Sequence, residues 1–175
     1  MKQKLTGLGK VVLMIAAVSV LTGCGTTKQE NAAQASTEKT QDAESVSDVR
    51  AETSVLADEN DALVIPVDNL SETVLFYPVE IDGISMEVMA AKDAQGDIHL
   101  AFNTCQVCYS SGKGYYEQEG DMLVCQNCGN RFTIDQLGEE AGGCNPIPIT
   151  ASDYESNGQE LTIPYSFLAQ YEGAF

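Results

Sequence analysis

Histidine and tryptophan are almost missing from this chain, which has one His and no Trp among 175 residues. The single histidine, His99, cannot supply a metal site that needs two imidazole ligands, and any Ser–His or Cys–His catalytic pair would depend on it alone. It stands in Gly96–Leu100, where we interpret it as an ordinary strand residue. No glycine-rich phosphate loop is present either. The chemistry of this chain therefore rests on its six cysteines.

Basic residues are few as well. The chain has 9 Lys and Arg against 26 Asp and Glu, and three of the lysines (Lys2, Lys4 and Lys10) precede residue 24. Residues 24–175 thus hold six basic and 26 acidic residues, a formal charge of −20. Such a surface repels nucleic acid and anionic headgroups, so we expect no nucleic-acid partner.

Long apolar runs are limited to one segment near the N-terminus. Three lysines precede the run from Val11 to Leu21, which is too short for a mature membrane span but has the length of a signal-peptide core. The run ends in Leu21-Thr22-Gly23-Cys24, which resembles a bacterial lipobox. We predict a lipoprotein signal peptide over 1–23 and acyl chains such as palmitate on Cys24, which tether the protein to the extracytoplasmic face of the bacterial cell membrane. A plain secretory signal with an incidental cysteine is the alternative.

Aromatic residues are absent before Phe76, and Gly25 to Asp61 contain no proline. This polar stretch cannot bury enough apolar area to offset the entropy of ordering. We predict a disordered, acidic and polar tether over residues 24–62, followed by one small cysteine-rich, metal-binding β domain over 63–175.

Short β-branched or apolar stretches separated by turn residues predict the strands of this domain. The expected strands are Thr73–Ile81, Ser85–Ala91, Asp97–Phe102, Tyr115-Tyr116, Met122–Val124 and Phe132–Ile134. A short helix is expected over Pro164–Tyr171, with Pro164 in its first turn. The fold class that follows is mainly β.

Two Cys-x-x-Cys motifs carry the strongest functional signal. Cys105 and Cys108 form the first pair and Cys125 and Cys128 the second, with sixteen residues between the pairs. At this spacing, two rubredoxin-type knuckles deliver four thiolates to one tetrahedral centre, and glycines that follow each pair permit the tight turns. Four thiolates suit either zinc or an iron–sulfur cluster. Cys144 is a fifth candidate, as a ligand, a hydrogen-bonding lid or a free thiol.

Disulfide chemistry competes with metal binding, because disulfides persist outside the cytoplasm. The pairs are either two structural disulfides or the active site of a thiol–disulfide oxidoreductase. Against the first, a bridge within Cys-x-x-Cys closes too small a loop to constrain the unfolded chain. Against the second, neither motif starts a helix in a βαβ pattern. Tyr109, Tyr115 and Tyr116 cluster near the first pair, and we interpret them as an apolar shell in preference to a surface through which electrons enter.

From Asp97 to Ile149 the sequence resembles the FtrD-like membrane iron–sulfur protein domain. The segments that carry the resemblance are Phe102–Cys108, Gly114–Tyr116, Val124–Gly129 and Gly142–Pro148. The resemblance implies an iron–sulfur or related metal centre and an association with extracytoplasmic iron transport, with an iron permease or a membrane redox protein as partner. Members of that family are often polytopic, whereas this chain shows no span after its signal.

A second similarity concerns the fold. A predicted strand leads into Asn-x-Cys, a glycine-rich loop follows, and the chain later runs through Cys-Gly-x-x-Phe. This order is similar to that of Rieske-type β domains, in which two hairpin loops hold a cluster. A standard Rieske centre needs two histidines, so it is excluded here. We therefore expect a Rieske-like scaffold with cysteine ligands only, which would give a more electron-rich cluster of lower potential.

These observations together predict a metal-binding or electron-transfer protein in preference to a stand-alone enzyme. The expected cofactor is an iron–sulfur cluster, and the alternative is a zinc ion that staples a small domain. The expected ligands are Cys105, Cys108, Cys125 and Cys128, with Cys144 as a fifth candidate.

Overall fold

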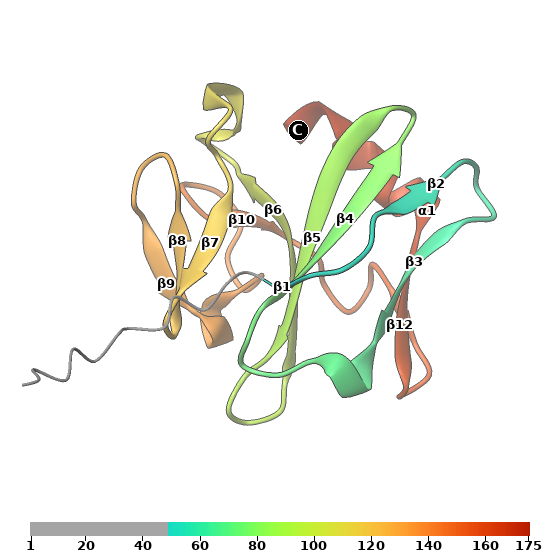
Figure 1. The fold of residues 1–175 in the computed structure, drawn as a ribbon, viewed down its shortest axis with the longest axis horizontal. Coiled ribbons are helices and arrows are strands. Elements are labelled where there is room, and N and C mark those ends of the chain that lie inside the picture. Colours follow the sequence, from blue (N-terminus) through green and yellow to red (C-terminus); the bar gives the residue numbers. More distant parts are fainter. Residues whose placement is uncertain (1–48) are drawn as a thin grey trace, which may run out of the picture. The chain divides into compact units, whose positions relative to one another are not determined.

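The computed structural model describes residues 49–175, and β-strands dominate this part of the chain (Figure 1). The predicted mainly β fold is confirmed. The predicted signal peptide, the lipidation site Cys24 and the tether up to residue 48 lie outside the described residues, so these remain predictions.

A six-stranded main sheet forms the centre of the fold. Its strand order is β1-β4-β5-β6-β10, with β2 also paired to β4. The strands are β1 (Val49–Arg50), β2 (Ser54–Leu56), β4 (Leu75–Ile81), β5 (Ile84–Lys92), β6 (Ile98–Cys105) and β10 (Pro146–Pro148). The β4–β5 hairpin turns at Asp82 and Gly83, both with positive φ, as a type I′ hairpin turn requires.

Two three-stranded sheets accompany the main sheet. One has the order β11-β12-β3 and comprises β3 (Ala62–Pro66), β11 (Glu155–Ser156) and β12 (Glu160–Pro164). The other has the order β7-β8-β9 and comprises β7 (Tyr116–Glu119), β8 (Met122–Cys125) and β9 (Arg131–Thr133). The helical segments are short: η1 (Val67–Asn69), η2 (Tyr109–Ser111), η3 (Ile134–Gln136), α1 (Tyr165–Leu168) and η4 (Ala169–Ala174).

The main sheet is buried on both faces because its strands alternate between two apolar clusters. In β5, Val88 belongs to the cluster shared with β3, β12 and α1, whereas Met89 belongs to the cluster shared with β7, β8 and β9. In β6, Phe102 belongs to the first of these clusters and Cys105 to the second. Figure 1 shows β7–β9 on one side of the main sheet and β3 and β12 on the other. The end of β6 therefore delivers Cys105 toward the β7–β9 sheet.

The predicted strands of the main sheet and the β7–β8 hairpin are confirmed, within a few residues at their ends. Two boundaries differ. Residues 49–62, assigned to the tether, contain β1 and β2, which pair in parallel with β4, so the folded part begins before Leu63. The predicted helix begins one residue later than expected, because Pro164 is the last residue of β12 and caps α1 in an extended conformation.

Candidate metal centre

The first knuckle, residues 105–108, follows directly from the end of β6. The Cys108 N–H donates to the Cys105 carbonyl at 3.1 Å, and the Cys105 N–H donates to the Gly114 carbonyl at 2.6 Å. The returning chain passes so close that a Cβ on Gly114 would lie 2.4 Å from the backbone carbon of Cys108. Only glycine fits there, and its absence of a side chain lets the loop close over the knuckle.

The second knuckle, residues 125–128, follows the end of β8 in the same way. The Gly129 N–H donates to the Cys125 carbonyl at 2.9 Å, and Gly129 has a φ of 72°. The Cys125 N–H donates to the Asn130 carbonyl at 2.9 Å. A further backbone bond, from Gln126 N–H to the Tyr115 carbonyl at 2.8 Å, joins this knuckle to the chain that leaves the first. The two knuckles are thus held side by side through backbone hydrogen bonds.

The loop of residues 142–145 leads into β10 and brings Cys144 to the knuckles. The Gln106 side chain accepts a hydrogen bond from the Gly142 N–H at 3.0 Å and donates one to the Pro146 carbonyl at 3.1 Å. The Asn130 side chain donates to the Cys144 carbonyl at 3.0 Å. The 142–145 loop is therefore tied to both knuckles, by Gln106 from the first and by Asn130 beside the second.

The five sulfur atoms form two overlapping triads, each with all Sγ atoms within 4.8 Å of one another. The inner triad is Cys105, Cys108 and Cys125, all buried. The outer triad is Cys108, Cys128 and Cys144, of which Cys128 is exposed and Cys144 half-buried. Cys108 belongs to both. The structure thus brings together all five predicted residues, but the four cysteines of the two pairs do not form one group within that distance.

Hydrogen bonds at the Cys105 sulfur favour its thiolate. Burial opposes ionisation, but bonds from the Tyr116 hydroxyl and from two backbone N–H groups of the turn outweigh it and lower the pKa of Cys105 to about 7. The bond to Cys105 adds to burial in raising the pKa of Tyr116 above its ordinary range, so this hydroxyl stays protonated and remains a donor. A thiolate of this kind is suited to bind a metal.

The other thiols differ in acidity. Burial raises the pKa of Cys125 to about 12, and a hydrogen bond with Cys128 raises that of Cys144 to about 12. The pKa of Cys128 is lowered, chiefly by the backbone N–H of Asn130. Thiolates this close repel one another, so full deprotonation requires a cation among them. The donor set, which is sulfur only, suits a thiophilic metal centre.

Residues 70–175 match the family described as membrane iron–sulfur containing protein, FtrD-like. The chain belongs to this family. No curated protein and no solved structure matches it. The match covers the whole cysteine centre, and the family description names the kind of cofactor that these thiolates suit. The similarity to Rieske-type domains stays a prediction.

Among residues 49–175, no helix is long and apolar enough to cross a membrane. The short α1 and the 3₁₀ segments lie among strands and loops. The family description nevertheless associates these proteins with membranes.

The three tyrosines near the first knuckle occupy different environments. Tyr116 is fully buried, as the shell interpretation requires, and its ring packs edge-on against Phe132 with centroids 5.2 Å apart. Tyr109 and Tyr115 are 46% and 38% exposed, so the shell interpretation is wrong for both. These two side chains lie on the surface around the knuckles of this FtrD-like domain.

His99 lies near the start of β6 and belongs to neither sulfur triad, as the strand interpretation expects. Its Nε2 lies 3.1 Å from an Asp93 carboxylate oxygen, and its Nδ1 lies 3.2 Å from the Leu137 carbonyl. It therefore holds the loop after η3 against the β5–β6 hairpin. The sequence analysis gave no separate role to Asn103 or Gln106, although their polar side chains, two residues before Cys105 and directly after it, were an available signal.

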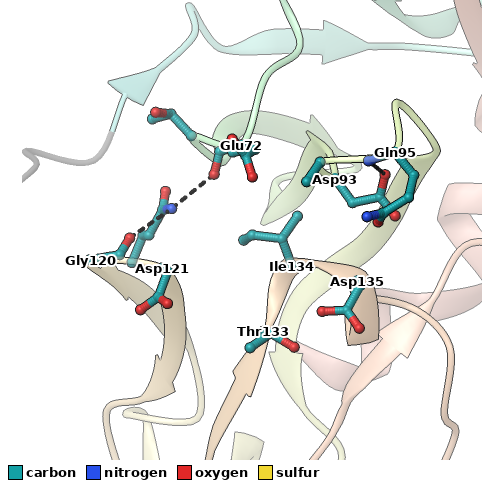
Figure 2. Close-up of a pocket in the computed structure, with 11 residues that line it drawn as sticks. Glu72, Asp93, Gln95, Gly120, Asp121, Thr133, Ile134 and Asp135 are labelled. Carbon is teal, nitrogen blue, oxygen red and sulfur yellow. Dashed lines mark hydrogen bonds between the residues drawn. The ribbon is translucent and has the colours of Figure 1, made fainter. Parts of the chain in front are cut away.

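A cavity of about 680 Å³ is lined by residues other than the cysteines (Figure 2). Four of the residues that line it are acidic and none is basic: Glu72, Asp93, Asp121 and Asp135. The Gln118 side chain, which also lines the cavity, donates to the Glu72 and Gly120 carbonyls at 3.0 Å each. No cysteine lines this cavity, so it is separate from the metal centre.

Proposed function

We propose that this chain is a lipid-anchored electron-transfer protein on the extracytoplasmic face of the bacterial membrane. Its five-cysteine centre holds an iron–sulfur cluster, and it exchanges electrons with a partner in iron transport, either an iron permease or a membrane redox protein. The observation that carries the proposal is the pair of sulfur triads that share Cys108, in a chain of the FtrD-like iron–sulfur family.

The triads favour a cluster over a single zinc ion. Four thiolates around one tetrahedral zinc lie about 3.8 Å apart in every pair, given a Zn–S distance of about 2.3 Å. The four sulfurs of the two Cys-x-x-Cys pairs do not all approach within 4.8 Å. A donor set that extends over two triads fits a centre with more than one metal atom.

The surroundings of the centre support electron transfer. When bound, an iron–sulfur cluster supplies a one-electron couple. The chain buries the inner triad among Phe132, Leu123 and other apolar residues, which exclude water from that side. On the other side Cys128 is exposed, so the centre has an edge that a partner can approach.

The three segments that carry the cysteines are nearly free of charged residues, unlike the rest of the chain. The segments 105–116, 122–130 and 141–149 contain no Asp or Glu, and their single charged residue is Lys113. Val107, Tyr109 and Tyr115 are exposed there. Exposed apolar side chains on segments without acidic residues are typical of a contact surface, and these segments carry the cysteines of the centre.

The test is an anaerobic analysis of iron, acid-labile sulfide and zinc in the full chain purified from membranes in detergent. We expect iron with sulfide and a visible band that bleaches with dithionite. Zinc at one per chain without visible absorption would make the centre structural. Absence of metal, with thiols oxidised in pairs, would contradict the proposal and favour thiol–disulfide exchange.

A further inference from the structure

The hydroxyl of Tyr116 lies between the two parts of the centre. It donates to the Cys144 carbonyl at 2.8 Å, on the loop that supplies the outer triad. It also hydrogen-bonds the Cys105 sulfur, which belongs to the inner triad. A tyrosine hydroxyl has one proton and therefore cannot donate fully to both acceptors at once.

The position of this hydroxyl is fixed by its surroundings. The Tyr116 N–H donates to the Asn103 side chain at 2.7 Å, and Tyr116 pairs with Cys125 across the β7–β8 hairpin. Its ring is fully buried against Phe132. The ring cannot move away from either acceptor, so a change in acceptor strength redirects the proton and leaves the side chain in place.

We infer that Tyr116 is a positioning residue that couples the negative charge on the inner triad to the 142–145 loop. When the charge on the Cys105 sulfur increases, the hydroxyl proton turns toward the sulfur. When this charge decreases, the proton turns to the Cys144 carbonyl and holds the loop. The redox part of this inference rests on the proposed function, because reduction is what adds charge to the thiolates.

Turning the Tyr116 proton from one acceptor to the other costs little free energy in this structure. The Cys144 carbonyl also accepts a hydrogen bond from the Asn130 side chain at 3.0 Å, so it keeps a partner when the Tyr116 proton turns away. The sulfur of Cys105 likewise keeps its two backbone N–H donors when the proton turns to the carbonyl. Neither acceptor is left buried and unsatisfied in either arrangement.

The test replaces Tyr116 with Phe, which removes the hydroxyl and keeps the ring. Iron and sulfide per chain should match the unsubstituted protein. The ratio of oxidised to reduced protein in a fixed mediator buffer should rise about tenfold, equivalent to 59 mV for one electron, because the sulfur loses a donor that stabilises the reduced state. The matched control is Tyr165→Phe, which removes an exposed hydroxyl bond to Asp82 and should leave the ratio unchanged.

A second variant addresses the coupling itself. Asn130→Ala removes the other donor to the Cys144 carbonyl, so the Tyr116 proton should spend more time there, and the potential should fall by less than in Tyr116→Phe. A Tyr116→Phe protein that holds the same cluster at an unchanged potential would overturn the inference. So would an Asn130→Ala protein with a raised potential.

Cobalt substitution separates this inference from the proposed function. In Co²⁺-loaded protein the sulfur-to-cobalt charge-transfer band reports directly on hydrogen bonds to the thiolates. It should move to longer wavelength in Tyr116→Phe and stay unchanged in Tyr165→Phe. An absence of iron from the unsubstituted protein would contradict the proposed function alone, whereas identical cobalt bands in all three proteins would contradict the role of Tyr116.

Discussion

The side-chain oxygen of Asn103 accepts a hydrogen bond of 2.7 Å from the Tyr116 N–H and so joins two sheets that share no strand pairing at this point. The amide nitrogen of the same side chain donates to Glu87 at 2.6 Å and to the Tyr116 carbonyl at 3.3 Å. Asn103 lies in β6, two residues before Cys105, and Tyr116 begins β7. One buried amide thus helps to set where the second knuckle sits relative to the first.

Replacement of Asn103 with Ala should therefore lower the free energy of unfolding by about 1–3 kcal/mol, because it leaves the buried Tyr116 N–H without its partner. Urea denaturation at unchanged slope would measure this loss. The control is Asn60→Ala, which removes only an exposed turn bond to Asp58 and should cost far less. Equal midpoints for the two variants would show that the amide bridge does not hold the sheets together.

Gly114→Ala should distort the first knuckle. The new Cβ would lie 2.4 Å from both the Cys108 carbonyl carbon and the Tyr109 nitrogen, which are backbone atoms that cannot rotate away. We expect a loss of about 1–3 kcal/mol in stability and a lower metal content per chain. Gly173→Ala is the control, since its Cβ meets nothing within 4 Å and its backbone is not strained. Normal metal content in Gly114→Ala would mean that the loop opens without moving Cys108.

Individual cysteine-to-serine variants should separate the two triads. Cys108→Ser removes a thiolate from both triads and should abolish metal binding, whereas Cys144→Ser affects only the outer triad and should keep most of the metal. Cys125→Ser should lose the centre as well, because it removes a buried ligand of the inner triad. Metal per chain and the visible spectrum measure these effects. If Cys144→Ser and Cys108→Ser lost equal amounts of metal, all five cysteines would act as one set of ligands and the division into two triads would be wrong.

The parts of the fold that the sequence predicts well are those with strong local signals. Alternating apolar residues in β4 and β5 and the Asp82-Gly83 turn between them predict this hairpin because side-chain period and turn chemistry agree. In contrast, β2 pairs with β4 through its backbone and leaves Val55 66% exposed. Because β2 shows no alternation of apolar and polar residues, its composition led us to predict that it belongs to the tether.

In the candidate site too, the sequence predicts the parts that depend on local geometry and not those that depend on long-range contacts. The two knuckles follow from the spacing of Cys105, Cys108, Cys125 and Cys128 alone, because Cys-x-x-Cys is a local geometry. The placement of Cys144 is not local. It depends on long-range bonds that Gln106 and Asn130 make to the 142–145 loop, and no spacing rule encodes these.

The proposed lipid anchor depends on Cys24, and its replacement provides the last prediction. Full-length protein with Cys24→Ser should take up no radiolabelled palmitate. It should also keep an N-terminal peptide that still contains the apolar run from Val11 to Leu21, because at a lipobox the cysteine sulfur receives a diacylglyceryl group before cleavage. A single acyl chain gives only marginal membrane binding, with an association constant on the order of 10⁴ M⁻¹, so stable attachment needs the several chains that lipidation at one cysteine provides. Mass spectrometry of the N-terminal peptide measures both effects. Cys144→Ser is the matched control, since it removes a different cysteine and should take up palmitate normally. If Cys24→Ser and the unsubstituted protein took up equal amounts of palmitate, the acyl chains would be attached elsewhere and the proposal of an anchor at Cys24 would fail.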